Sequence, residues 1–308
     1  MAFSDFVDFS HYSELLPLVQ NSLYAGAALG LLGGLVGVFV IARDLPFAVH
    51  GISELSFAGA AGALLLGGSV VAGSFAGSII AAALIAAMGA RARDRNSVIG
   101  VLMPFGLGLG ILFLALYEGR AANKFGLLTG QIVAVDDARL TLMAGTAVAV
   151  VLVLAVIWRP LMFASVDADV AAARGVPVGL LHWVFMLLLG CTIAVAVQVV
   201  GALLVLALLC TPTAAALRLT TSPVLLPLLS SLFALTAMLG GTFLALGTSI
   251  PISPYVTTIS FATYLLARLL GRPDRRGTPP THDTGDTDDA GDGNERTSPS
   301  AVAVTAAR

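Results

Sequence analysis

The chain has 308 residues, of which 57% are hydrophobic and 11% are charged, and its formal net charge is −2. Soluble chains carry about 25% charged residues, so this composition excludes a water-soluble globular protein and indicates lipid as the solvent. A near-zero net charge with one lysine, Lys124, also argues against a nucleic-acid partner. The N-terminal segment has acidic residues but no basic n-region, so a cleavable signal peptide is not expected.

A spanning helix needs about 20 mostly apolar residues. The sequence predicts an all-α, polytopic membrane bundle with about nine such helices, within a range of eight to ten. The apolar run at 181–217 would be about 55 Å long as one helix, too long for a hydrocarbon core of about 30 Å. It is therefore split near Gln198–Gly201 into two spans. The nine predicted spans are 22–42, 47–67, 69–90, 97–117, 139–158, the two halves of 181–217, 224–246 and 254–270.

Arginine residues indicate how these spans are oriented. Three lie in RARDRN at 91–96, two lie in a polar loop predicted at 159–178, and four lie between 268 and 276. The positive-inside rule puts these three segments in the cytoplasm. With nine spans, the N-terminus and residues 118–138 are then expected outside.

Composition divides the chain into two parts, a transmembrane domain at 1–270 and a tail at 271–308. The tail is rich in Asp, Thr, Gly and Pro and has too little apolar content to fold, so it is predicted to be a disordered cytoplasmic segment. The 33 glycines are interpreted mainly as positions where helices pack closely in lipid. Cys191 and Cys210 lie in apolar runs and are interpreted as small packing residues.

Two ionisable residues, His50 and Glu54, stand near the start of the second predicted span. Residues four apart lie on one face of a helix, and imidazole together with carboxylate suits zinc or manganese. Two ligands are too few for a closed zinc site, which takes four, but a two-fold dimer would supply two copies of each. The alternative is an interfacial ion pair at a helix start.

A short cytoplasmic helix is predicted within residues 166–178, VDADVAAARGVPV. Gly175 stands in the usual C-terminal position of a helix, and a proline follows. The alternative is an ordinary connecting loop. Farther along, Pro212 is predicted to be a helix break, with Thr211 and Thr213 satisfying the freed backbone groups, or else a kink that only shapes the bundle.

Several stretches of the chain, within about residues 20–270, resemble the membrane permease subunit of zinc/manganese-type ABC importers. The family's D-x-x-x-A-x-x-x-G-V loop is matched from Asp167 to Val176, and its V-G-x-L-L run with a later P-x-A-x-A is matched by VVGALLVLALLCTPTAAA at 199–216. Its Pro-x-Gly-Pro before the last helix is matched by Pro251-Ile-Ser-Pro254, with serine where glycine is usual.

A further stretch departs from the family pattern. In the family an Arg-x-Met stretch leads into a helix that carries Asp-x-x-x-His. In this chain Arg43-Asp44-Leu45 leads into His50-x-x-x-Glu54, so the acid and the histidine are exchanged. Because the same two ligand types occupy the same helix face, the resemblance implies that His50 and Glu54 form a transient metal site, with an altered coordination geometry.

The resemblance implies the permease subunit of an ABC transporter that imports a divalent metal, zinc first and manganese second, across the plasma membrane. It also implies a homodimer, a separate cytoplasmic ABC ATPase and an extracytoplasmic metal-binding protein as partners, with no bound cofactor. The ATPase-coupling positions are then Asp167, Ala171, Ala172 and Gly175. An enzyme is not expected, since the sequence has no GxxxxGK[ST] loop and ATP would be hydrolysed on another polypeptide.

Two rival functions belong to other classes. An ATP-independent secondary transporter of a small solute would use His50 and Glu54 as a proton-coupling pair, and inverted repeats, which the sequence does not clearly show, would favour it. An intramembrane enzyme would need a nucleophile with its base, or a full metal site, and the sequence shows neither.

Overall fold

Nine apolar helices and one short helix make up the part of the chain that the computed structural model describes, residues 19–88, 92–119, 135–246 and 251–271. No strand occurs in these described residues, which confirms the predicted all-α class. The helices are α2 (Gln20–Ala42), α3 (Pro46–Leu65), α4 (Val70–Met88), α5 (Ala92–Leu116), α7 (Asp137–Val166), α8 (Ala168–Ala173), α9 (Val178–Val200), α10 (Val205–Leu219), α11 (Leu225–Leu246) and α12 (Ile252–Leu270).

Seven of these helices, α2, α3, α4, α5, α7, α9 and α11, are long and apolar enough to cross a membrane by length and composition. The shorter apolar helix α10 has 15 residues, and α12 has 19 residues with Arg268 in its last turn. The predicted count of about nine spans corresponds to the seven long helices together with α10 and α12.

Hydrogen bonds between helix ends show that α2 and α7 run in the same direction. At one end of the bundle, Asn21 in the first turn of α2 donates to Asp137, the first residue of α7, over 2.7 Å. At the other end, Arg43 after α2 donates to Ser165 near the end of α7 over 3.4 Å. The assignment of the Arg43 end to the cytoplasm remains a prediction from arginine placement.

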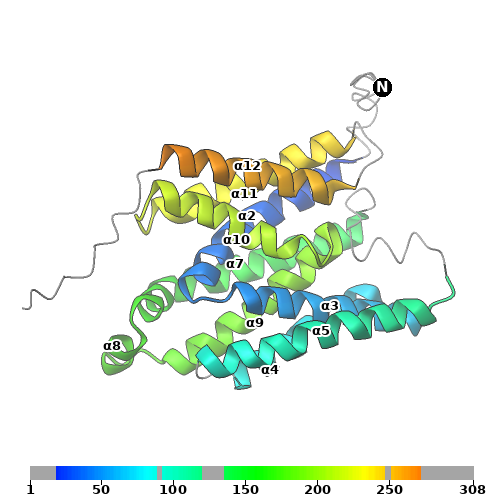
Figure 1. Cartoon of the computed structure of the whole chain (residues 1–308), viewed down its shortest axis with the longest axis horizontal. Coiled ribbons are helices and arrows are strands. Elements are labelled where there is room, and N and C mark those ends of the chain that lie inside the picture. Colours follow the sequence, from blue (N-terminus) through cyan, green and yellow to red (C-terminus); the bar gives the residue numbers. More distant parts are fainter. Residues whose placement is uncertain (1–18, 89–91, 120–134, 247–250, 272–308) are drawn as a thin grey trace, which may run out of the picture. The chain divides into compact units, whose positions relative to one another are not determined.

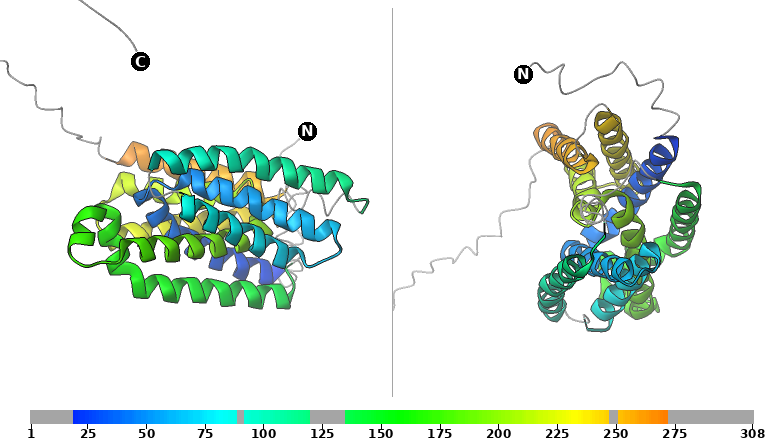
Figure 2. Two further views of the ribbon diagram at one scale, coloured as in Figure 1. Left: turned by 90° about the horizontal axis from the view of Figure 1, so that it is seen from below. Right: turned by 90° about the vertical axis from the view of Figure 1, so that its right-hand side faces the viewer.

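The helices pack in two groups joined by α9 (Figures 1 and 2). The first group contains α2, α10, α11 and α12, and the second contains α3, α4 and α5. Helix α9 packs against α3 and α4 on one side and against α2 and α7 on the other. Helix α10 also contacts α3, so α3 lies at the boundary between the two groups.

Glycines let the helices of each group approach closely. A Cβ on Gly30 would lie 2.8 Å from Leu235 Cα of α11, and Cβ atoms on Gly34 and Gly37 would meet the backbones of α11 and α10. In the second group, Gly59 of α3 meets Gly73 of α4 in the same way. In lipid, close backbone contact replaces the hydrophobic effect as the force between helices, so these glycines are packing positions, as the sequence predicts.

The long apolar run divides where the sequence indicates. Helix α9 ends at Val200, and Gly201 then adopts φ 78°, a backbone conformation that residues with a Cβ rarely take. The carbonyl of Val200 accepts a hydrogen bond of 3.1 Å from Ser253 at the start of α12. Together these features turn the chain between α9 and α10 and fix the break against the last helix.

Two sequence predictions about helix boundaries are wrong. The polar loop expected from Arg159 does not begin there, because α7 continues to Val166. Trp158 packs edge-on against Phe39 at 4.7 Å between ring centroids, and Leu161 is fully buried, so tertiary contacts carry the helix past its apolar span. The helix break expected at Pro212 is also absent, because Pro212 lies inside α10, which is one helix.

The predicted tail lies outside the described residues apart from Gly271, as does the N-terminal segment at 1–18. Cys191 and Cys210 are both free and partly buried, in agreement with their interpretation as packing residues.

Candidate functional site

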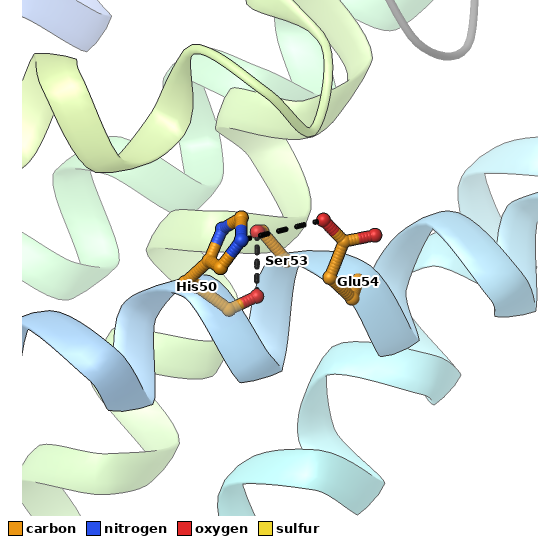
Figure 3. A network of polar contacts seen from close by, with 3 residues as sticks. All are labelled: His50, Ser53 and Glu54. Carbon is orange, nitrogen blue, oxygen red and sulfur yellow. Dashed lines mark hydrogen bonds and ion pairs between the residues drawn. The ribbon is translucent and has the colours of Figure 1, made fainter. Parts of the chain in front are cut away.

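The two candidate metal ligands lie side by side on α3. Figure 3 shows His50 and Glu54 projecting from the same side of the helix, one turn apart. The distance from His50 Nε2 to Glu54 Oε1 is 3.8 Å, which is beyond hydrogen-bond range. The side chain of His50 is 29% exposed and that of Glu54 is 3% exposed. The pair therefore combines a ligand that is open to its surroundings with one that is almost fully enclosed.

Each of these side chains has a buried polar atom without a hydrogen-bond partner among the described residues. The atoms are Nδ1 of His50 and Oε2 of Glu54. An unsatisfied buried polar group costs about 1–3 kcal/mol, and more when it is charged. Such atoms are rare in folded proteins, and an ion that occupies the site is one explanation.

The separation of the pair fits two ligands of one metal ion. With metal–ligand distances of about 2.1 Å, two neighbouring ligands of a tetrahedral ion lie about 3.4 Å apart. The observed 3.8 Å between His50 Nε2 and Glu54 Oε1 exceeds that value by a few tenths of an ångström. A small side-chain rotation would therefore let both atoms bind the same ion.

Other helices hold this part of α3 in place. Gly106 of α5 packs directly on the backbone at Glu54 and Leu55, and Gly51 packs against Ile99 and Met103 of α5. Ser53 donates a hydrogen bond of 2.8 Å to the carbonyl of His50 (Figure 3). The described residues contain no cluster of three or more histidines, cysteines or acids that could hold a metal, so one copy of the chain offers two protein side chains for the ion.

The short helix α8 is well defined between α7 and α9. Asp167 caps it, because its side chain accepts hydrogen bonds from the backbone N–H groups of Asp169 and Val170 over 3.1 and 2.9 Å. Gly175 follows the helix with φ 83°, as expected for a residue after a helix C-terminus. The predicted short helix is confirmed here, although its first helical residue is Ala168.

The four predicted coupling residues have different surroundings. Ala171 is fully buried, with 0% exposure. Ala172, Asp167 and Gly175 are exposed. In the described structure Ala171 therefore faces the protein, and the other three are accessible to a partner.

The region around Pro212 is held by a chain of hydroxyl groups. Thr213 donates to the carbonyl of Leu209 over 3.3 Å, its hydroxyl lies 2.7 Å from that of Ser230, and Ser230 donates to the carbonyl of Gly34 over 2.9 Å. This chain joins α10, α11 and α2. Thr213 bonds to the carbonyl of Leu209 and not to that of Leu208, four residues before Pro212, so its role in satisfying the freed backbone group stays a prediction, as does that of Thr211.

Arg43 stands out in the sequence only as part of the stretch before His50, and it makes contacts that the sequence does not predict. Its guanidinium group reaches Ser165 of α7, lies 3.5 Å from His182 Nδ1 of α9 and stands over the ring of Phe185 at 5.8 Å from the centroid. These partners lie more than 120 residues away along the chain. A single sequence carries no signal for such contacts, so only the fold reveals them.

Comparisons with known proteins agree with one another. The profile of the ABC 3 transport family matches residues 16–271. The manganese import system permease protein ScaB of Streptococcus pneumoniae is 30% identical over 262 residues, which cover 84% of this chain and 92% of that protein. The manganese transport system membrane protein MntC of Halalkalibacterium halodurans is 28% identical over 250 residues, which cover 81% and 86%.

A solved structure has the same arrangement of helices. PsaBC from Streptococcus pneumoniae, determined in complex with Fab, superposes with a TM-score of 0.77 at 26% identity. The match covers 87% of this chain and 98% of the other. The fold therefore agrees with the polytopic helical bundle that the sequence predicts.

Proposed function

The chain belongs to the ABC 3 transport family, and we propose that it is the permease subunit of an ATP-driven importer whose cargo is manganese. It is a multi-pass protein of the bacterial plasma membrane. The observation that carries the proposal is the pair on α3, His50 and Glu54, with one buried atom of each left without a partner. Ionisable groups inside a membrane are costly and commonly line an ion pathway.

Manganese is favoured over zinc because both curated relatives described above are named as manganese permeases. The ligand types do not separate the two metals, since imidazole and carboxylate suit both, and zinc binds more tightly than manganese at a generic nitrogen and oxygen site. The order expected from the sequence, with zinc first, is therefore reversed in this proposal.

The ion would bind briefly between two copies of the chain. Since the described part of one copy offers only His50 and Glu54 at this place, a two-fold dimer would bring four protein ligands to the axis. A site assembled at such an axis can be taken apart by small movements of α3. This property suits a transport site, which must release its ion, better than it suits a structural site.

The energy would come from a separate ATPase docked on the end of the bundle where α8 lies. Asp167, Ala172 and Gly175 would form the accessible part of the docking helix, and Ala171 would anchor it to the bundle. An extracytoplasmic binding protein would deliver the ion at the opposite end. A secondary transporter is not favoured, because the family match extends over 16–271 and includes α8.

The proposal is tested by uptake of radiolabelled manganese in a bacterium that lacks its own importer. Expression of the chain together with its ATPase and binding protein should give uptake that stops when ATP is depleted and that excess cold manganese suppresses. ATP-dependent uptake of radiolabelled zinc, with no such uptake of radiolabelled manganese, would restore the zinc assignment. Uptake that follows the proton gradient and needs no ATPase would support the secondary transporter instead.

Ala172→Asp is expected to uncouple transport from ATP hydrolysis. The residue is exposed on α8, so the added carboxylate should leave the bundle intact while disturbing the docked surface. Manganese uptake should fall by about tenfold or more, which corresponds to about 1.4 kcal/mol of lost interaction, with normal amounts of protein in the membrane. Ala173→Asp is the matched control, because Ala173 is also exposed on α8; comparison of the two variants shows whether the loss of uptake depends on the position of the carboxylate. Unchanged uptake and unchanged retention of the ATPase would remove α8 from the docking site.

Truncation after Arg272 is expected to leave manganese uptake near normal. The removed segment has too little apolar content to contribute to a packed core. The measurement is uptake per amount of membrane-inserted protein, compared with the full chain. A loss of uptake at normal expression would show that the tail docks or regulates a partner.

A further inference from the structure

Arg43 occupies the junction of four structural elements. It follows the last residue of α2 and precedes α3, which carries His50 and Glu54. Its NH1 group reaches Ser165, two residues before Asp167, and its NH2 group reaches His182 of α9. One side chain therefore touches both helices that flank α8.

The surroundings of Arg43 are rigid on one side. Phe39, one turn earlier on α2, is fully buried and packs against Trp158 of α7 at 4.7 Å and against Phe185 of α9 at 5.8 Å between ring centroids. The Arg43 guanidinium group covers the ring of Phe185. This aromatic cluster fixes the end of α2 against α7 and α9, so a displacement of those helices would be passed to α2.

On the other side, Arg43 leads into α3 through a tight turn. Asp44 has φ 54°, an uncommon conformation for a residue with a Cβ. The N–H of Leu45 donates to the carbonyl of Val40 over 2.8 Å, and the Leu45 side chain is buried. Pro46 then begins α3. Because this short, hydrogen-bonded turn connects Arg43 directly to α3, a shift of Arg43 would move α3 and with it His50 and Glu54.

We propose that Arg43 is a positioning residue that transmits movement of α8 to His50 and Glu54. The polar contacts of its guanidinium group with Ser165 and His182, 3.4 and 3.5 Å long, are at the weak end of the hydrogen-bond range. They can therefore be exchanged or tightened when α7 and α9 shift, whereas the aromatic cluster stays packed. This inference rests on the proposed function, in which a partner acts on α8, but it concerns a residue that belongs neither to α8 nor to the pair His50 and Glu54.

A purely structural role for Arg43 gives a different outcome. If Arg43 only holds α2, α7 and α9 together, its removal lowers the melting temperature, and it lowers ATP hydrolysis and transport in the same proportion. If it transmits movement, its removal leaves assembly and ATP hydrolysis in place and reduces the manganese transported per ATP. Arg43→Lys keeps the charge but loses the planar fork that reaches two partners, so it should give an intermediate value.

The first test uses the full chain with its ATPase in proteoliposomes. Arg43→Ala is expected to reduce the manganese transported per ATP hydrolysed by about fivefold or more, the range of a typical coupling energy, with Arg43→Lys in between. The matched control is Arg159→Ala, which removes an exposed arginine of α7 near the same end of the bundle. An unchanged transport ratio for Arg43→Ala, or a proportional loss of both activities together with a lower melting temperature, would overturn the proposal.

The second test needs no transport and separates this inference from the proposed function. Hydrogen exchange is measured at residues 44–54 of the purified full chain. Asp167→Ala, which removes the cap of α8, should speed exchange there, whereas the same change in an Arg43→Ala background should add nothing further. Equal effects of Asp167→Ala in both backgrounds would overturn the role of Arg43. A wild-type complex without ATP-dependent uptake would overturn the proposed function, and the exchange result would still decide the inference.

Discussion

Glu54→Gln is expected to abolish manganese uptake while leaving the protein as stable as the wild type or more so. The side chain is 3% exposed, and one carboxylate oxygen has no partner among the described residues. Replacing a buried carboxylate by a neutral amide of the same shape lowers the cost of burial but removes a strong ligand. Uptake should fall by about 100-fold or more, because even groups that merely orient metal ligands contribute about 10–100-fold. The predicted loss of transport is checked by manganese uptake, and the predicted stability is checked by the melting temperature in detergent.

His50→Ala should have the same effect on uptake, and retention of the ATPase should persist in both variants. Ser53→Ala is the matched control, because Ser53 lies next to the pair and its hydroxyl bonds only to the carbonyl of His50 in the described structure. The exchange His50→Asp with Glu54→His keeps both ligand types on one face, and it should retain part of the uptake. Near-normal uptake by both single variants would reduce the pair to an interfacial ion pair at a helix start.

Gly34→Leu is expected to prevent correct folding in the membrane. A Cβ at Gly34 would meet the backbone of α11 at Ser230 and Ser231, and the same region carries the hydrogen bond from Ser230 to the Gly34 carbonyl. A backbone contact cannot move aside as a flexible side chain can. Overpacking a well-filled interior lowers stability by about 1–3 kcal/mol and occasionally more. Because Gly34→Leu would force α2 and α11 apart, its loss of stability should lie at or above the upper end of that range. The yield of monodisperse protein in detergent and its melting temperature measure the effect.

Gly145→Ala provides the comparison for that prediction. Gly145 lies inside α7, and a Cβ added there would have no atom within 4 Å. Alanine favours a helix over glycine by about 1 kcal/mol, so this variant should be unchanged or slightly more stable. If Gly34→Leu folded with the yield and melting temperature of Gly145→Ala, the close approach of α2 and α11 would not be needed for the fold.

Local composition and spacing were enough to predict most of the helices and the shared helix face of His50 and Glu54. Apolar stretches of about 20 residues define the spans, since lipid requires that length regardless of what the neighbouring helices are. The spacing of His50 and Glu54 gave their common face, because helical periodicity is a local property. The end of α9 was also predictable, because the length limit of a span placed a split near Gln198–Gly201.

Tertiary packing decided the features that local rules missed. Helix α7 continues past Arg159, beyond the predicted span 139–158, because Trp158 packs against Phe39 of α2 and Leu161 is buried in the protein. Pro212 is accommodated inside α10, where Thr213, Ser230 and Gly34 link three helices by hydrogen bonds. No periodicity in a single sequence describes such contacts, because their partners lie far away along the chain.

The sequence by itself determined that the chain is an integral membrane protein, that it crosses the membrane several times and that α3 carries an imidazole and a carboxylate on one face. Each of these properties follows from composition or from local spacing: a span needs about 20 apolar residues, and the shared face of His50 and Glu54 needs one helical turn. The tertiary structure alone decided which of the two predicted coupling alanines is buried, which glycines meet a neighbouring backbone and which elements Arg43 joins. These properties depend on the close approach of separate helices, where backbone geometry and side-chain volume, and not local propensity, set the outcome.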